Sequence, residues 1–237
     1  SDTVSGRIVP FRGVHLRRRG AWRLGGSPVG AWMRLTLRAL PAATIAGSLI
    51  LPVIFIAFGY LIVLHNPDLD RDTATRTVRI SGTLALIALA SSMATSVVRA
   101  RPSWPWTRSL PWSSRQRVLG DTMLHGIGLV AVAASQIPLD ARSAVAVLLV
   151  APPMAAAAAS AIRLGARRQT SAAGETALIG CALGCLVALW PWTSGIVLAT
   201  TPLLLAMAIR RERSLVATRW NELHHDAAGD PAWMTAS

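Results

Sequence analysis

The sequence contains no lysine, so all 24 of its basic side chains are arginines. A P-loop holds nucleotide phosphates with a lysine that follows a glycine-rich turn, so no segment of this sequence can form that ATP site. Cysteine is also scarce. The two cysteines, Cys181 and Cys185, lie four residues apart in one apolar run. Helical spacing and an apolar environment both disfavour a disulfide between them, so they say little about the redox compartment.

Charged residues are few. They make up 15% of the 237 residues, against 52% hydrophobic residues and a mean hydropathy of +0.45. A soluble domain carries about 25% charged residues, so this composition excludes an ordinary soluble fold. Six apolar runs approach or exceed the roughly 20 residues that cross a hydrocarbon core. They cover residues 41–64, 80–98, 118–138, 143–162, 173–190 and 193–209.

Lipid offers the backbone no hydrogen-bond partner, so each of these runs is predicted to be a helix. The predicted fold class is therefore all-α, a polytopic membrane bundle of six transmembrane helices. If the first run enters from the cytoplasm, every arginine lies on the cytoplasmic side except Arg71, Arg76, Arg79 and Arg142. The positive-inside rule predicts this distribution for six spans with both termini cytoplasmic.

The net charge of +13 is also compatible with nucleic-acid binding, because arginine clusters neutralise phosphates. The uneven distribution of arginine between the connections favours a different role. Arginines that set membrane topology lie against anionic lipid head groups. We therefore predict the lipid bilayer as a partner and no nucleic acid.

Polarity divides the chain into four segments. Residues 1–27 are predicted as a basic cytoplasmic lead-in, 28–40 as an interfacial amphipathic helix, 41–209 as the six-helix transmembrane domain and 210–237 as a cytoplasmic tail. Because Ser1 is not an initiator methionine, the sequence is compatible with a trimmed chain or with part of a longer protein.

The segment 28–40 has the pattern of a helix in the membrane interface. Trp32 and Leu35 recur on one face, while Arg34 and Arg38 lie four residues apart on the other. A serine suited to cap the helix precedes a proline at its first position. Such a helix is expected to lie in the plane of the membrane surface. The alternative is a simple extension of the first transmembrane helix.

The first outer connection, His65 to Arg79, carries carboxylates at alternate positions, Asp68, Asp70 and Asp72. A calcium loop needs glycine at its sixth position and glutamate at its twelfth, where this sequence has Thr73 and Arg79. The connection is therefore predicted to be a solvated loop. Two adjacent histidines near the end of the chain lack further ligands, so no metal site is predicted.

The connection between the second and third runs, residues 99–117, combines three tryptophans, five arginines and several prolines. Tryptophan prefers the head-group region, so an aromatic belt with positive-inside charge explains this composition. A docking surface for a soluble partner is the more specific interpretation. Either Ser113 or Ser114 is suited to cap the third span.

A short motif in this connection resembles one in the permease subunits of type-2 ATP-binding-cassette exporters. It consists of an aromatic–x–Arg–x–Leu–Pro element at residues 106–111 and a Ser- and Arg-rich helix start at residues 113–119. In that family the segment couples the permease to the ATPase, and an amphipathic helix precedes the first span. The resemblance implies an ATPase-coupling loop that includes Trp104, Trp106, Arg108, Leu110, Pro111, Arg115 and Arg117.

The resemblance also implies the function and the partners. This chain would be a transport subunit rather than an enzyme, in the bacterial plasma (inner) membrane, and would bind no cofactor itself. ATP and Mg would be held by a separate cytoplasmic ATPase subunit. A second six-helix unit, identical or related, would complete the pathway. The family often has short extra helices before its last span, whereas Trp190 to Trp192 leaves room only for a tight turn.

Ionisable residues within the spans provide other candidates. Asp121 and His125 lie four residues apart in the third span, and intramembrane ionisable residues are often functional, so a pathway role is one hypothesis. The alternative is a pair bonded to each other or to Arg117. With Glu175, these two residues also form the acid–base set of a competing hypothesis, a polytopic membrane enzyme. A membrane anchor or assembly subunit is a third possibility.

Prolines and glycines mark two further features. Pro152 and Pro153 fall inside the fourth span, where the missing backbone donors require rescue by neighbours or a local break, so they are a candidate hinge. Gly180 and Gly184 form a small-xxx-small face suited to close helix packing, either within the bundle or at a dimer seam.

Overall fold

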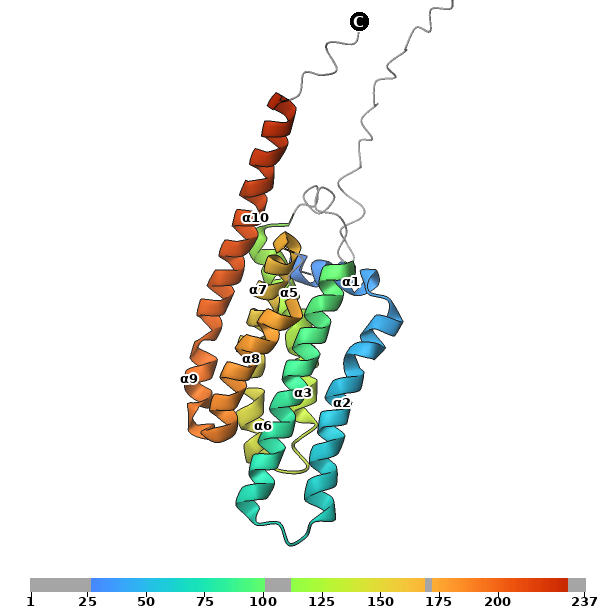
Figure 1. Ribbon diagram of the computed structural model, residues 1–237, viewed down its shortest axis with the longest axis vertical. Coiled ribbons are helices and arrows are strands. Elements are labelled where there is room, and N and C mark those ends of the chain that lie inside the picture. Colours follow the sequence, from blue (N-terminus) through green and yellow to red (C-terminus); the bar gives the residue numbers. More distant parts are fainter. Residues whose placement is uncertain (1–26, 101–111, 169–171, 230–237) are drawn as a thin grey trace, which may run out of the picture.

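The structure is a computed structural model that describes residues 27–100, 112–168 and 172–229. The regular elements in these ranges are all helices. Six helical spans are long and apolar enough to cross a membrane. They lie alongside one another in a bundle, as Figure 1 shows. The predicted all-α polytopic bundle with six spans is confirmed.

Four spans are single helices, and two are interrupted. The described helices, in chain order, are α1 (Pro28–Ala39), α2 (Ala42–His65), α3 (Arg71–Ala100), α5 (Ser114–Ala134), α6 (Ala141–Leu148), α7 (Ala151–Arg168), α8 (Ala172–Leu189), η1 (Pro191–Thr193), α9 (Ser194–Ala199) and α10 (Thr201–Gly229). The fourth span combines α6 and α7, and the sixth runs from η1 into α10. α10 continues past the bundle at the end where α1 lies (Figure 1).

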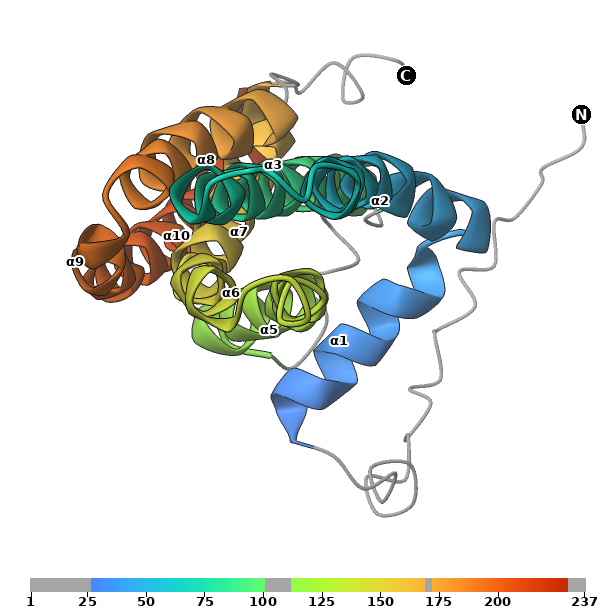
Figure 2. The same ribbon diagram turned by 90° about the horizontal axis from the view of Figure 1, so that it is seen from below.

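α1 lies across one end of the bundle. Viewed along the bundle axis, the spans are seen end-on and α1 from its side (Figure 2). The side chain of Ser27 caps the helix by accepting a hydrogen bond from the Gly30 amide at 3.2 Å. Trp32 is buried, whereas Arg34 and Arg38 are exposed. The extended backbone after α1 separates it from α2, so α1 is a separate helix across the end of the bundle and not an extension of the first span.

α7 occupies the centre of the bundle. Its alanine run, residues 155–159, is at most 1% exposed, as are Met154 and Ile162. Small side chains let neighbouring helices approach closely, which in lipid is a main source of helix association. α2 lies at the edge instead, and its apolar side chains such as Ile50 and Phe58 are exposed. Such side chains suit contact with lipid.

The prediction of a solvated loop from His65 to Arg79 is wrong for most of its length. α3 begins at Arg71, and the carboxylate of Asp70 caps it by accepting a hydrogen bond from the Thr73 amide at 3.0 Å. A helix can continue beyond its apolar stretch, because a capped polar turn is as well solvated in water as a loop. α3 therefore carries an ordered polar face beyond the apolar span.

Prolines lie in the first turn of the last helix of both interrupted spans. Pro152 and Pro153 follow a break at Leu149 and Val150, and they occupy the first turn of α7. Pro202 stands in the same way at the start of α10. The first turn has no intrahelical partner for its amides, so the missing N–H groups cost little there. A local break is one of the two arrangements predicted for the proline pair.

Candidate functional site

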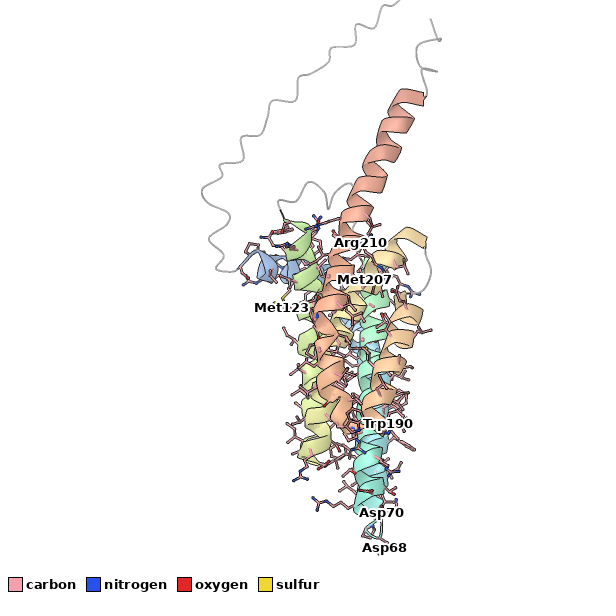
Figure 3. All side chains as sticks on the ribbon, turned by 90° about the vertical axis from the view of Figure 1, so that its left-hand side faces the viewer. Asp68, Asp70, Met123, Trp190, Met207 and Arg210 are labelled. Carbon is pink, nitrogen blue, oxygen red and sulfur yellow. The ribbon has the colours of Figure 1, made fainter. Side chains whose placement is uncertain are left out.

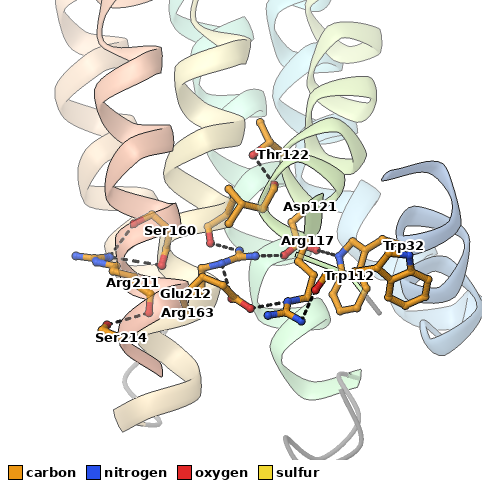
Figure 4. A network of polar contacts seen from close by, with 12 residues as sticks. Trp32, Trp112, Arg117, Asp121, Thr122, Ser160, Arg163, Arg211, Glu212 and Ser214 are labelled. Atoms are coloured by element: carbon orange, nitrogen blue, oxygen red, sulfur yellow. Dashed lines mark hydrogen bonds and ion pairs between the residues drawn. The ribbon is translucent and has the colours of Figure 1, made fainter. Parts of the chain in front are cut away.

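Four charged side chains meet inside the end of the bundle where α1 lies, here termed the arginine-rich end (Figure 4). Arg117 and Asp121 come from α5, Arg163 from α7 and Glu212 from α10. Nη2 of Arg163 lies 2.7 Å from Oδ2 of Asp121, and its Nε lies 3.0 Å from Oε2 of Glu212. Nε of Arg117 donates a hydrogen bond of 2.8 Å to Oε1 of Glu212. We call these four residues the ion-pair network.

The ion-pair network is buried and electrically balanced. The side chains of Asp121 and Arg163 are 0% exposed, and those of Glu212 and Arg117 are 2% and 9% exposed. Backbone carbonyls accept further hydrogen bonds, that of Trp112 from Arg117 Nη1 at 3.0 Å and that of Ala159 from Arg163 Nη1. Removal of one partner leaves an uncompensated buried charge, which typically costs about 3–5 kcal/mol.

The network also holds α1. Nε1 of Trp32, in α1, donates a hydrogen bond of 2.8 Å to Oδ1 of Asp121. The Trp32 ring packs edge-on against Trp112, with centroids 5.5 Å apart. Gly120 makes room for this ring, because a Cβ atom there would lie only 2.5 Å from it. α1 is therefore fastened to the start of α5 by a charged hydrogen bond and by close packing.

A second, partly buried contact joins three helices beside the network. Nη1 of Arg211 on α10 contacts the carboxylate of Glu175 on α8, and donates to Oγ of Ser160 on α7 at 2.9 Å. Glu175 lies in the first turn of α8, where the helix dipole also favours a negative charge. Together, the two sets of contacts connect α1, α5, α7, α8 and α10 at the arginine-rich end.

The structure shows the partners of Asp121 and His125. The carboxylate of Asp121 bonds to Arg163 and Trp32, and Arg117 pairs with Glu212 instead. Nδ1 of His125 lies 2.7 Å from the backbone carbonyl oxygen of Asp121. Both side chains are 0% exposed. The structure thus identifies the charged partner of Asp121, which the i, i+4 spacing of Asp121 and His125 did not predict.

Sequence reasoning missed Trp32, Arg163 and Glu212 as members of this site. Arg163 follows a run of buried small and apolar residues, which signals a charge that needs a partner inside the protein. Glu212 is an acid among the arginines 210, 211 and 213, where a topological signal alone would need only positive charge. Both signals were present, although neither names a partner.

No family model, curated protein or solved structure matches the chain. The chemistry of the site is therefore inferred from its own residues.

The predicted coupling loop is only partly described. Trp104, Trp106, Arg108, Leu110 and Pro111 lie outside the described residues. At the described end of the loop, Ser113 and Gln116 form a capping box that starts α5.

Two predicted coupling residues can be placed. Arg115 is exposed and accessible to a partner. Arg117 was also predicted to belong to the docking surface. Its side chain is instead buried against Glu212, because that carboxylate compensates its charge inside the bundle.

Gly180 and Gly184 lie where α8 packs against its neighbours inside the bundle. A Cβ atom at Gly184 would lie 2.1 Å from Thr83 on α3, and one at Gly180 would lie 2.8 Å from Met154 on α7. Both glycines thus serve packing within the chain. The candidate hinge at Pro152 and Pro153 begins α7 about 16 Å along the helix from Arg163, at 1.5 Å per residue.

Proposed function

We propose that the chain is the membrane-spanning subunit of an ATP-binding-cassette exporter, with ATP hydrolysed by a separate cytoplasmic subunit that docks on residues 104–117. The observation that carries this proposal is the physical continuity between the end of that segment and the ion-pair network. The carbonyl of Trp112 accepts a hydrogen bond from Arg117, and the Trp112 ring packs on Trp32. Both Arg117 and Trp32 bond directly to network carboxylates.

These contacts suit the transmission of a mechanical displacement. A movement of the docked partner would act on the capped start of α5. Buried ion pairs resist separation by several kcal/mol, so α7 and α10 would move with α5 rather than away from it. The central position of α7 would then carry the displacement into the bundle. The break between α6 and α7 gives the fourth span a place to change angle.

The absence of lysine from the sequence adds a separate argument. The chain needs another subunit for any P-loop ATP chemistry. The arginines expected on the cytoplasmic side supply a cationic surface for an acidic partner. A second six-helix unit would complete a central pathway in the assembled exporter.

The competing proposal of a membrane enzyme has less support. Its acid–base set was Asp121, His125 and Glu175. Asp121 is held by Arg163, and Glu175 is held by Arg211. An acid–base catalyst must reach the substrate proton, and the fully buried Asp121 carboxylate is already committed to two donors.

Co-purification tests the proposal. The tagged chain is isolated from its native membrane in mild detergent, and the eluate is assayed for ATP hydrolysis. We expect an ATPase subunit to elute with the wild-type chain. The double substitution Trp106→Ala, Arg108→Ala should remove it or uncouple its ATPase activity from transport.

The matched control is Trp192→Ala, which removes an exposed tryptophan at the other end of the bundle and should leave the complex intact. Full transport activity of the isolated chain in liposomes without nucleotide would contradict the proposal. Loss of turnover in Asp121→Asn with an intact partner complex would favour the enzyme.

A further inference from the structure

A second concentration of charge lies at the opposite end of the bundle. There α3, the start of α6 and η1 line an open pocket of about 360 Å³. Its charged lining consists of Arg71, Arg79 and Arg142 with Asp72 and Asp140. Three of the four arginines that the topology places outside thus converge on one pocket.

The three pocket arginines are not neutralised as the network arginines are. In the ranges that the structure describes, no carboxylate lies within ion-pair distance of Arg71, Arg79 or Arg142. Nε of Arg79 is buried, and no described group accepts a hydrogen bond from it. A buried guanidinium N–H without an acceptor is costly, so the Arg79 side chain gains a hydrogen bond if it turns toward an acceptor that enters the pocket.

The two carboxylates of the pocket, Asp140 and Asp72, have partners other than the guanidinium groups of the pocket. Oδ2 of Asp140 caps α6 by accepting a hydrogen bond from the Ser143 amide at 2.9 Å. The hydrogen bond with the Ser143 side chain is the largest cause that holds the pKa of Asp140 below its ordinary value, with Arg71 contributing. Asp72 lies 3.7 Å from Arg76, which is not part of the pocket lining. The pocket therefore keeps an excess of positive charge.

The pocket lies at the level expected for lipid head groups. Pro191 lines it, and the flanking Trp190 and Trp192 are 50% and 72% exposed. Exposed tryptophans mark the membrane–water interface. Figure 3 places Asp70, the residue before Arg71, further toward the tip than Trp190. Arg79 is roughly 12 Å along α3 from Arg71, at 1.5 Å per residue, so the pocket extends from the tip toward this belt.

We propose that this pocket binds a phosphate-type oxyanion, supplied either by a lipid head group or by a free phosphate. The planar fork of a guanidinium matches phosphate oxygens and forms two parallel charge-assisted hydrogen bonds. Arg79 provides the buried donor, and Arg71 and Arg142 close the site from the tip of α3 and the start of α6. The proposal does not depend on a transport function.

Binding to the full chain in detergent tests the proposal with two probes. Retained phosphatidylglycerol is counted by native mass spectrometry, and inorganic phosphate is titrated against thermal stability at constant ionic strength. We expect Arg79→Gln to weaken binding of the active probe by on the order of tenfold, because it removes a charge-assisted hydrogen bond. The affinity of Arg79→Lys should lie between those of the wild type and Arg79→Gln, since lysine keeps the charge but lacks the planar guanidinium fork.

Arg76→Gln is the matched control, because it lies on the same helix and outside the pocket. Retention of phosphatidylglycerol without a response to phosphate identifies the lipid as the source, and a response to phosphate identifies the free anion. Both outcomes support the proposal, provided that the pocket variants lose the retained lipid or the phosphate-dependent stabilisation. The proposal is overturned if a monodisperse Arg71→Gln, Arg79→Gln, Arg142→Gln variant behaves like the wild type with both probes. If that variant does not stay monodisperse, Arg142→Gln, at an exposed position, replaces it under the same criterion.

Discussion

The two ends of the bundle use the same residue type in different ways. At the arginine-rich end, Arg117, Arg163 and Arg211 are each matched by a carboxylate from another helix. At the opposite end, Arg71, Arg79 and Arg142 line a pocket without such partners. An arginine that is paired inside the chain joins helices, whereas an unpaired one is available to a ligand. The placement of 11 acidic residues decides which role each arginine takes.

The largest effect is expected when the paired end loses a carboxylate. Asp121→Ala leaves the buried Arg163 with one fewer counter-charge and removes the acceptor for Trp32. We expect the free energy of unfolding in detergent to fall by about 3–5 kcal/mol. Asp68→Ala, in an exposed connection, is the control and should change it by less than about 0.5 kcal/mol. Equal effects of the two substitutions would remove the distinction between the ends.

A smaller effect is expected when the network loses its hold on α1. Trp32→Phe keeps an aromatic ring beside Trp112 but removes the N–H that donates to Asp121. The loss of a hydrogen bond to a charged group should cost about 1.5–3 kcal/mol. Hydrogen exchange should then speed up in α1 more than in α2. Unchanged protection of α1 would show that packing alone fastens it, and Trp192→Phe serves as the control for aromatic substitution.

The middle of the bundle should respond to volume rather than to charge. Gly184→Ala places a methyl group 2.1 Å from Cγ2 of Thr83, so either the buried Thr83 side chain changes rotamer or α8 and α3 separate. Overpacking of this kind costs about 1–3 kcal/mol. Gly47→Ala is the matched control, because its Cβ would meet no atom within 4 Å and alanine favours a helix. Thermal unfolding of both variants measures the difference, and a stable Gly184→Ala protein would refute the close packing.

The smallest effect on stability is expected at the unpaired end. Without a bound anion, Arg79→Gln removes a charge that has no partner among the described residues. The free energy of unfolding should stay within about 0.5 kcal/mol of the wild-type value or rise, because a buried N–H without an acceptor is lost. A loss similar to that of Asp121→Ala would mean that Arg79 holds the fold rather than a ligand.

Sequence reasoning succeeded where the cause is local. Hydropathy identified six spans, and their helices follow from the lack of backbone partners in lipid. The cap at Ser27 was also predicted, and Ser113 is one of the two serines predicted to cap the third span, because capping depends on residues three positions apart. The start of α3 at Arg71 was missed because the length of the apolar run was taken as the length of the helix.

The partners in the network could not be read from the sequence. Asp121 and Arg163 are 42 residues apart, and Arg117 and Glu212 are 95 apart. Their contact depends on which helices are neighbours in the bundle and on their rotation, and hydropathy alone fixes neither. A buried acid such as Asp121 signals that a cation is near but not which one. The pocket at the other end was hidden for the same reason, since α3, α6 and η1 create it together.

A double-mutant cycle on Asp121 and Arg163 tests most directly whether paired charges hold the arginine-rich end together. Asp121→Asn and Arg163→Gln each leave one buried charge uncompensated, while the double variant restores the balance, because Glu212 keeps Arg117. We predict that the two costs in free energy of unfolding are not additive and that the coupling is at least about 1.5 kcal/mol. Additive costs within about 0.5 kcal/mol would show that these charges act independently and do not join the helices.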